Sequence, residues 1–152
     1  MTIEEELKTK KFEDPFQKAN VNLLFTAGLV KASFNRRLKS HGITLEQYNV
    51  LRILKGSHPE PMCVKEITCR MIDRSSNTTR IIDKLEKKKL AERTPSANDG
   101  REVKVVLKKE AFQLLETVAK ELEKLSKANV KFTASQAENL SQLLDCLRDA
   151  ME

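Results

Sequence analysis

Four neighbouring side chains in the middle of the chain have the chemistry to read the edges of DNA bases: Ser76, Asn77, Thr79 and Arg80. An Asn amide pairs through two hydrogen bonds with adenine, an Arg guanidinium pairs with guanine, and the Thr methyl group meets that of thymine. Short polar side chains followed by an Arg suit the first turn of a helix that enters a major groove. They also suit a capped helix whose outer face is only solvated.

A helix is the element that must carry these residues, because its other face is marked by residues that recur at helical spacing. This inward set is Thr78, Ile81, Ile82, Leu85 and Lys89. The preceding turn, residues 73–76, offers Asp and Ser side chains for capping the free backbone N–H groups. A shorter amphipathic helix over residues 64–71 comes before that turn. The sequence therefore predicts a helix-turn-helix.

Two short strands are expected next, over residues 90–93 and 103–107. Apolar residues alternate along the second strand, which is typical of a strand buried on one face. The connection between the strands, residues 94–101, is rich in turn formers and ends on Arg101. An Arg at the tip of such a ribbon can enter a minor groove, where the negative potential is strongest. In an ordinary surface hairpin, Arg101 would only be solvated.

This stretch resembles the winged helix-turn-helix core of the MarR family of bacterial transcriptional regulators. The matching runs are residues 64–67, 76–88, 90–93 and 99–101. The family's T-R-L-[VI]-D-[RK]-L-E pattern is met over residues 79–86, and its D-x-R wing tip by Asp99 and Arg101. The resemblance implies a mainly α fold with a small β-wing, in which N- and C-terminal dimerisation helices flank the winged helix-turn-helix.

The sequence departs from the family pattern at two places. Lys89 stands where the family usually has Gly after the recognition helix. It must therefore either adopt a positive φ at some cost or extend the helix. After the wing, residues 107–112 replace the usual L-T-x-x-G, so the N-cap Thr is absent where the next helix starts.

The N-terminal flank predicts a loose lead-in over residues 1–14, then a helix over residues 15–41 that Gly42 ends. Thr44 and Gln47 have the spacing of a capping box, which starts the next helix.

The C-terminal flank keeps helical spacing from Ala111 to about residue 128, and Thr133 with Gln136 forms another capping box for a last helix. We expect three regions: residues 1–43 with a dimerisation helix, residues 44–108 with the winged helix-turn-helix, and residues 109–152 completing the dimer interface. Because apolar stripes at both chain ends need a partner, a two-fold homodimer is expected.

The implied function is a dimeric, sequence-specific DNA-binding transcriptional regulator, a repressor that a small-molecule effector releases. Its partner would be double-stranded DNA with an inverted-repeat operator. The expected DNA-binding residues are Ser75, Ser76, Asn77, Thr79 and Arg80 in the turn and helix, Arg101 in the wing, and Lys65, Arg74, Lys84 and Lys104 at the phosphates. The expected effector-binding residues are Phe34, Arg37, His41 and Tyr48.

Charge and composition favour a polyanion partner. The net charge is +6, and residues 62–110 hold thirteen Lys or Arg against eight Asp or Glu. No apolar run is long enough to cross a membrane, and the acidic N-terminal residues 1–6 lack the hydrophobic core of a signal peptide, so we expect a cytoplasmic protein. The sequence has no Gly-rich phosphate loop, metal cluster or nucleophile–base pair, so no enzyme activity, metal or cofactor is expected.

Two alternatives remain open. A redox-responsive regulator would act through Cys63 or Cys69, although Cys69 is better interpreted as a small buried residue. A protein-interaction module can also keep a winged-helix shape without reading DNA, because a fold does not fix a function.

Overall fold

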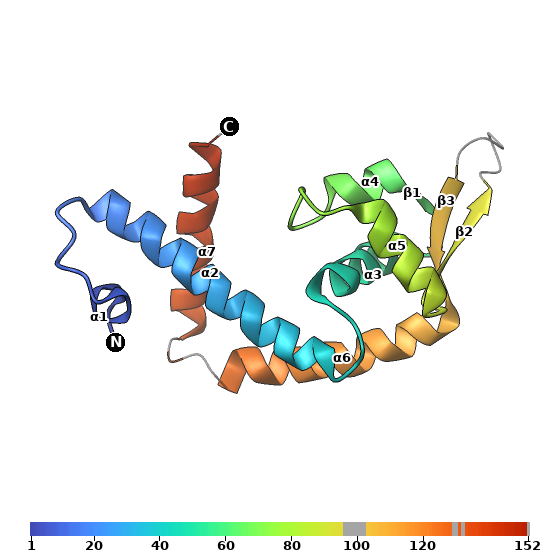
Figure 1. The fold of residues 1–152 in the computed structure, drawn as a ribbon, viewed down its shortest axis with the longest axis horizontal. Helices are drawn as coiled ribbons and strands as arrows, with labels where there is room; N and C mark the ends of the chain where they lie inside the picture. The colour runs from blue at the N-terminus through green and yellow to red at the C-terminus, as the bar shows by residue number, and fades with distance from the viewer. Residues whose placement is uncertain (96–102, 129–130, 132, 152) are drawn as a thin grey trace. The chain divides into compact units, whose positions relative to one another are not determined.

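The computed structural model describes residues 1–95, 103–128, 131 and 133–151, with the side chains of residues 125–128 excepted. The chain divides into two compact units, residues 1–119 and 120–152. The first unit holds the helices and the sheet of the winged module, shown in Figure 1. The predicted fold class is confirmed: the protein is mainly helical with one small sheet.

The N-terminal part of the first unit begins with a short helix, α1 (Ile3–Leu7), where the sequence had suggested a loose lead-in. That expectation was wrong, because Thr2 and Glu5 form a capping box and Ile3 is buried. Helix α2 (Pro15–Lys39) follows, with Asp14 as its N-cap and Pro15 at its first position. Gly42, at φ +69°, lies in the turn after α2. Predicted helix and observed helix thus agree within two residues at the C-terminal end.

Helix α3 (Leu45–Ser57) starts at the predicted capping box, where the Thr44 side chain accepts a hydrogen bond from the Gln47 backbone N–H. Strand β1 (Met62–Cys63) leads directly into α4 (Val64–Cys69), and the turn after α4 leads to α5 (Thr78–Lys87). Figure 1 shows α4 and α5 beside α3, and each of these three helices packs against the other two. This is the helix-turn-helix that the periodicity predicted.

The sheet has three antiparallel strands in the order β1-β3-β2, one more than the sequence predicted. Strands β2 (Ala91–Pro95) and β3 (Val103–Leu107) form the expected hairpin, with Arg93 opposite Val105. Strand β1 adds to the other edge of β3, pairing Met62 with Val105. Two residues are too short a run to show alternation, which is why the sequence did not reveal β1.

The core of the first unit lies between the helices and the sheet. Its fully buried side chains come from each of the main elements: Leu38, Leu51, Ile67, Ile82, Leu85, Val105 and Leu115. Their burial orients the polar faces of α4 and α5 outward. Removing any of these large side chains from such a core typically costs about 2–5 kcal/mol.

The two C-terminal helices are α6 (Lys109–Ala128) and α7 (Ala134–Asp149). Helix α6 begins at Lys109 without the Thr cap that the family favours, and its first half contributes Ala111, Leu115 and Val118 to the core of the first unit. Helix α7 begins at the predicted capping box of Thr133 and Gln136. In the second unit α7 has no buried residue.

Candidate nucleic-acid interface

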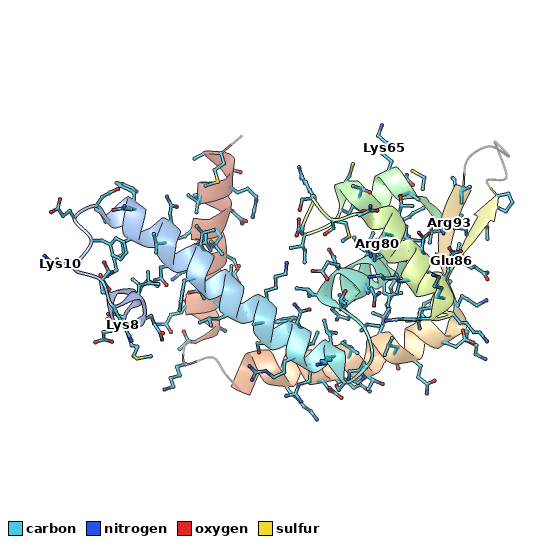
Figure 2. All side chains as sticks on the ribbon, in the orientation of Figure 1. Lys8, Lys10, Lys65, Arg80, Glu86 and Arg93 are labelled. Atoms are coloured by element: carbon cyan, nitrogen blue, oxygen red, sulfur yellow. The ribbon has the colours of Figure 1, made fainter. Side chains whose placement is uncertain are left out.

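Helix α5 has one buried and one exposed face, as its sequence predicted. Two members of the predicted inward set differ: Ile81 is only half-buried, and Lys89 is exposed after the end of the helix, so its inward placement was wrong. Thr78, Ile82 and Leu85 are buried, with exposed fractions of 4% or less. The exposed face carries Arg80, which Figure 2 labels on α5, together with Thr79, Asp83 and Lys84. The side chains expected to contact bases and phosphates therefore share one outward surface, which we call the reading face (residues 76, 77, 79, 80, 83 and 84).

The N-cap of α5 is Asn77, not one of the Asp or Ser side chains of the preceding turn. Its Oδ1 accepts a hydrogen bond from the Arg80 backbone N–H at 3.0 Å. An adenine contact of the two-pronged kind needs both the oxygen and the nitrogen of the amide. Since the cap takes one lone pair of that oxygen, Asn77 presents to a groove the N–H donors of its amide and one remaining acceptor position. Arg80 and Thr79 keep their full side-chain chemistry for base contacts.

The turn between α4 and α5 is organised by Asp73. Its Oδ1 accepts hydrogen bonds from the Ser75 hydroxyl at 2.6 Å and from the Ser75 backbone N–H at 3.1 Å. These bonds, the hydroxyl first, lower the pKa of the Asp73 carboxyl below its ordinary value. A hydroxyl has one proton to donate. Ser75 therefore donates to Asp73 in this structure, and its oxygen is left as an acceptor.

Helix α4 presents Lys65 outward, and Figure 2 shows that side chain extending away from the helix. The helix begins at Cys63, whose Sγ accepts from the Glu66 N–H at 3.5 Å while Glu66 Oε2 accepts from the Cys63 N–H at 2.7 Å. Cys63 is thus the weak N-cap of α4 and one half of a capping box. Thr68 Oγ1 lies 2.9 Å from Thr78 Oγ1, which joins α4 to the start of α5.

Arg93 is the residue of this surface that sequence reasoning missed. From strand β2 its guanidinium contacts Glu86 Oε2 through Nη1 and Asp83 Oδ1 through Nη2, the latter at 2.7 Å. Its backbone N–H donates to Glu86 Oε1 at 2.9 Å, and Figure 2 shows Arg93 and Glu86 facing each other. Asp83 and Glu86 carry negative charge next to the reading face, where it would repel DNA. Arg93 offsets part of that charge and joins the wing to α5.

The wing itself is described only at its base. Lys104, in β3, is half-buried. Arg101, expected at the tip, lies outside the described residues. The α5–β2 joint contains Lys89 at φ +59°, so the family's Gly is replaced by a residue in the left-handed conformation. The Lys89 N–H donates to Glu86 O at 2.8 Å and the Leu90 N–H to Leu85 O at 2.9 Å, the two bonds of a Schellman motif.

Two shallow hollows border the reading face and the turn after α2. The first, about 380 Å³, is lined by α3 and α5 residues: Thr44, Glu46, Gln47, Ser76, Asn77, Arg80, Ile81 and Lys84. The second, about 520 Å³, is lined by Asn35, Lys39, Gly42, Ile43, Thr44 and Glu46. Neither is lined by the expected effector residues. Of these, Phe34 and His41 are half-buried, Arg37 is exposed and Tyr48 is buried.

The cysteines differ from expectation in one respect. Cys69 is exposed, so its interpretation as a small buried residue was wrong; it lies on the outer face of α4, opposite the buried Ile67. Cys63 is half-buried, and neither is in a disulfide. In the described part of the chain no three His, Cys, Asp or Glu side chains gather as a metal site. None of its helices has the length and hydropathy of a membrane span.

The helix-turn-helix, the hairpin that follows it and the reading face define a winged helix-turn-helix protein. Residues 43–103 match the sequence model of the MarR family. This part of the chain is therefore similar to the MarR family, and the resemblance seen in the sequence is confirmed over these residues. No curated protein sequence matches the chain.

Solved structures with this fold cover nearly the whole chain. A putative MarR-like transcription regulator from Bacillus cereus has a TM-score of 0.78 at 20% identity, over 90% of this chain and 97% of its own. A MarR transcription factor from Planctomyces limnophilus has a TM-score of 0.68 at 26% identity, over 91% and 98%. The S. aureus MepR–DNA complex has a TM-score of 0.78 at 18% identity, over 88% and 98%. The chain thus has the fold of a MarR-family transcription regulator.

Proposed function

We propose that the protein is a dimeric, sequence-specific DNA-binding repressor that acts in the cytoplasm on an inverted-repeat operator. The observation that carries the proposal is the reading face, where Thr79 and Arg80 are exposed beside Lys84 in the first turns of α5. MepR, which shares the fold, has been solved in complex with DNA. A helix N-terminus of this composition suits a major groove.

Each proposed contact has a defined role. Thr79 and Arg80 would contact base edges, Asn77 would contribute its N–H donors, and Ser76 would lie at the groove edge. Phosphates would be held by Lys65, Arg74, Lys84 and Lys104, of which all but the half-buried Lys104 are exposed. Ser75, whose donors are taken by Asp73, would offer only its acceptor oxygen to a donor on the DNA. Arg101 would reach the minor groove. No step of this scheme requires a metal, a cofactor or an enzyme activity.

The proposed dimer rests on apolar side chains that are exposed within each unit. On α2, Leu24 is 75% exposed and Leu29 57%; on α7, Leu143 is 67% exposed. Large exposed apolar side chains on helices are typical of a face that another protein surface covers. A second copy of the chain would supply that surface and give the two reading faces that an inverted repeat requires. Residues 1–43 and 109–152 would then flank residues 44–108 as dimerisation regions.

Release by a small effector is the further part of the proposal. Phe34, Arg37, His41 and Tyr48 are the proposed site, completed by the partner copy. Redox control is the second candidate, because the thiol of Cys69 is exposed on the same helix as Lys65.

The test is binding to the protein's own upstream DNA, with random duplex as competitor, at two salt concentrations. Arg80→Ala should weaken binding by about 1–3 kcal/mol and relax the sequence preference at one position. The matched control is Arg36→Ala, an exposed Arg on α2, which should bind as the wild type does. Binding that random duplex removes, or that ignores salt, would contradict DNA reading and favour a protein-interaction module. Binding of Arg80→Ala equal to that of the wild type would refute the assignment of the reading face.

A further inference from the structure

The last residue of the α5 region, Lys88, reaches back to a different part of the fold. Its Nζ donates hydrogen bonds to the backbone carbonyl of Gly42 and to Gln47 Oε1, the latter at 2.9 Å. Gly42 belongs to the turn that ends α2, and Gln47 to the first turn of α3. Lys88 thereby ties the C-terminal end of α5 to the α2–α3 corner, which we define as residues 40–47.

The acceptors at this corner are fixed by contacts of their own. Gln47 is 3% exposed, and its Oε1 also accepts from the Thr44 N–H at 3.3 Å as part of the capping box. The Gln47 N–H in turn donates to Thr44 Oγ1 at 3.3 Å. An amide oxygen has two lone pairs, so one side of it can cap α3 while the other receives Lys88. The position of the ammonium group is therefore set by α2 and α3.

The chemistry of the contact differs from that of a phosphate-binding lysine. The described partners of Lys88 are two neutral oxygens rather than a carboxylate, and both are protein atoms. A charge-assisted hydrogen bond of this kind is roughly twice as strong as a neutral one. Lys88 is exposed, as are its neighbours Lys87 and Lys89. Of three consecutive lysines, Lys88 is the one that the fold uses to hold a helix end.

A second polar link, through Lys31 on α2, joins the first turn of α3 to the turn before α5 and is looser. Lys31 Nζ, on α2, lies 3.6 Å from Glu46 Oε1 and 3.9 Å from Asp73 Oδ2, and half of its side chain is exposed. Exposed pairs at such distances contribute little to stability. The Lys88 contact is therefore the firmer of these two polar links, and it is the one that starts from the end of α5 itself.

We propose that Lys88 is a positioning residue for DNA binding, which holds α5 in the orientation that a groove accepts and itself contacts no phosphate. This inference rests on the proposed DNA-binding function. If loss of the contact lets α5 leave that orientation, the apparent affinity falls in proportion to the fraction of molecules that remain competent. The intrinsic contacts with DNA, and with them the number of counterions released, stay the same.

The experiment measures operator affinity against salt concentration for wild type, Lys88→Met, Lys88→Arg and two comparison variants. Lys88→Met should bind about tenfold more weakly, as for a competent fraction of about one tenth, with the wild-type slope of log K against log salt. Lys88→Arg keeps the charge and the donors and should restore the affinity to within about twofold. Lys84→Met, at a proposed phosphate contact, should reduce the slope by about 0.9. Lys87→Met is the matched neighbour and should bind like the wild type.

Two outcomes overturn the inference while the wild type binds its operator: wild-type affinity for Lys88→Met, or a slope for that variant reduced by about 0.9, which marks a phosphate contact. Failure of the wild type to bind defeats the proposed function first and the inference with it, so the two failures are distinct. If circular dichroism shows that Lys88→Met is unfolded, Lys88→Gln carries the same test, because its shorter side chain keeps polarity but cannot span to both acceptors. Wild-type binding by Lys88→Gln would then refute the inference.

Discussion

Lys89 offers a direct test of the backbone geometry at the end of α5. Its φ of +59° lies in the left-handed region, where a residue with a Cβ pays roughly 1–2 kcal/mol. Gly avoids that penalty but loses more chain entropy on folding, about 0.5–1 kcal/mol. Because the Lys89 side chain is exposed, little packing is lost. Lys89→Gly should therefore raise the free energy of unfolding by about 0.5–1 kcal/mol.

Urea denaturation followed by circular dichroism, at one fixed protein concentration, measures this change. The surface exposed on unfolding is nearly unaltered, so the slope m should stay constant and the midpoint should rise. With m of about 2 kcal/mol per molar urea, the midpoint shifts by roughly 0.25–0.5 M. A thermal melt should move upward by about 1–4 °C for a chain of this size.

Lys87→Gly is the matched control, because it removes the same side chain from the last turn of α5, where the backbone is helical. There Gly should destabilise the protein by about 1 kcal/mol relative to a good helix former. Opposite signs for the two variants would establish the left-handed conformation. A loss of stability in Lys89→Gly as large as that in Lys87→Gly would refute the reasoning.

The other predictions concern the reading face and the turn. Arg93→Met should weaken operator binding by about 1–3 kcal/mol, and a double variant that also carries Asp83→Asn should regain part of the lost affinity. Fluorescence anisotropy measures the affinity of the wild type and of both variants. Equal affinities for the three proteins would contradict the charge argument. The pKa of Asp73 is lower in the folded protein than its ordinary value of 3.8, so the charged carboxylate stabilises the fold at any pH above 3.8. This stabilisation is lost as the pH falls through the pKa that Asp73 has in the folded protein. The stability advantage of wild type over Asp73→Asn should thus vanish in strong acid; a pH-independent difference in unfolding midpoint would exclude the mechanism. If a thiol controls DNA binding, Cys63→Ser with Cys69→Ser should remove the response of operator affinity to peroxide, whereas an affinity that peroxide never changes removes the redox candidate.

Much of the fold could be predicted because its signals are local. The capping box of Thr44 and Gln47 appears in the sequence as two residues three apart, and the structure forms it. The inward spacing of Ile82 and Leu85 set the orientation of α5, and both are buried. Even the missed helix α1 had such a signal, since Thr2 and Glu5 have the same spacing. A charged composition outweighed that signal in the sequence-based expectation.

The remaining features depend on residues that only the fold brings together. Arg93 reaches Asp83 across ten residues of sequence, and Lys88 reaches Gln47 across 41. No spacing rule connects such pairs, because their distance depends on how β2 and α3 pack against α5. The exposure of Cys69 could not be predicted either, because a small apolar side chain fits either face of a short helix. Asn77 is the N-cap of α5, but several neighbouring polar residues could have capped this helix, and the sequence did not show which of them would.

Cys63 belongs to two elements at once, and this has a mechanical consequence. It is paired with Lys104 as the last residue of β1, and it is also the N-cap of α4. Strand and helix follow each other without a linker at this point of the described chain, so there is no residue between them to act as a hinge. Any tilt of α4 against a DNA surface must carry β1 with it, and through β1 the base of the wing. Helix α4 and the base of the wing would therefore move together when the protein meets DNA.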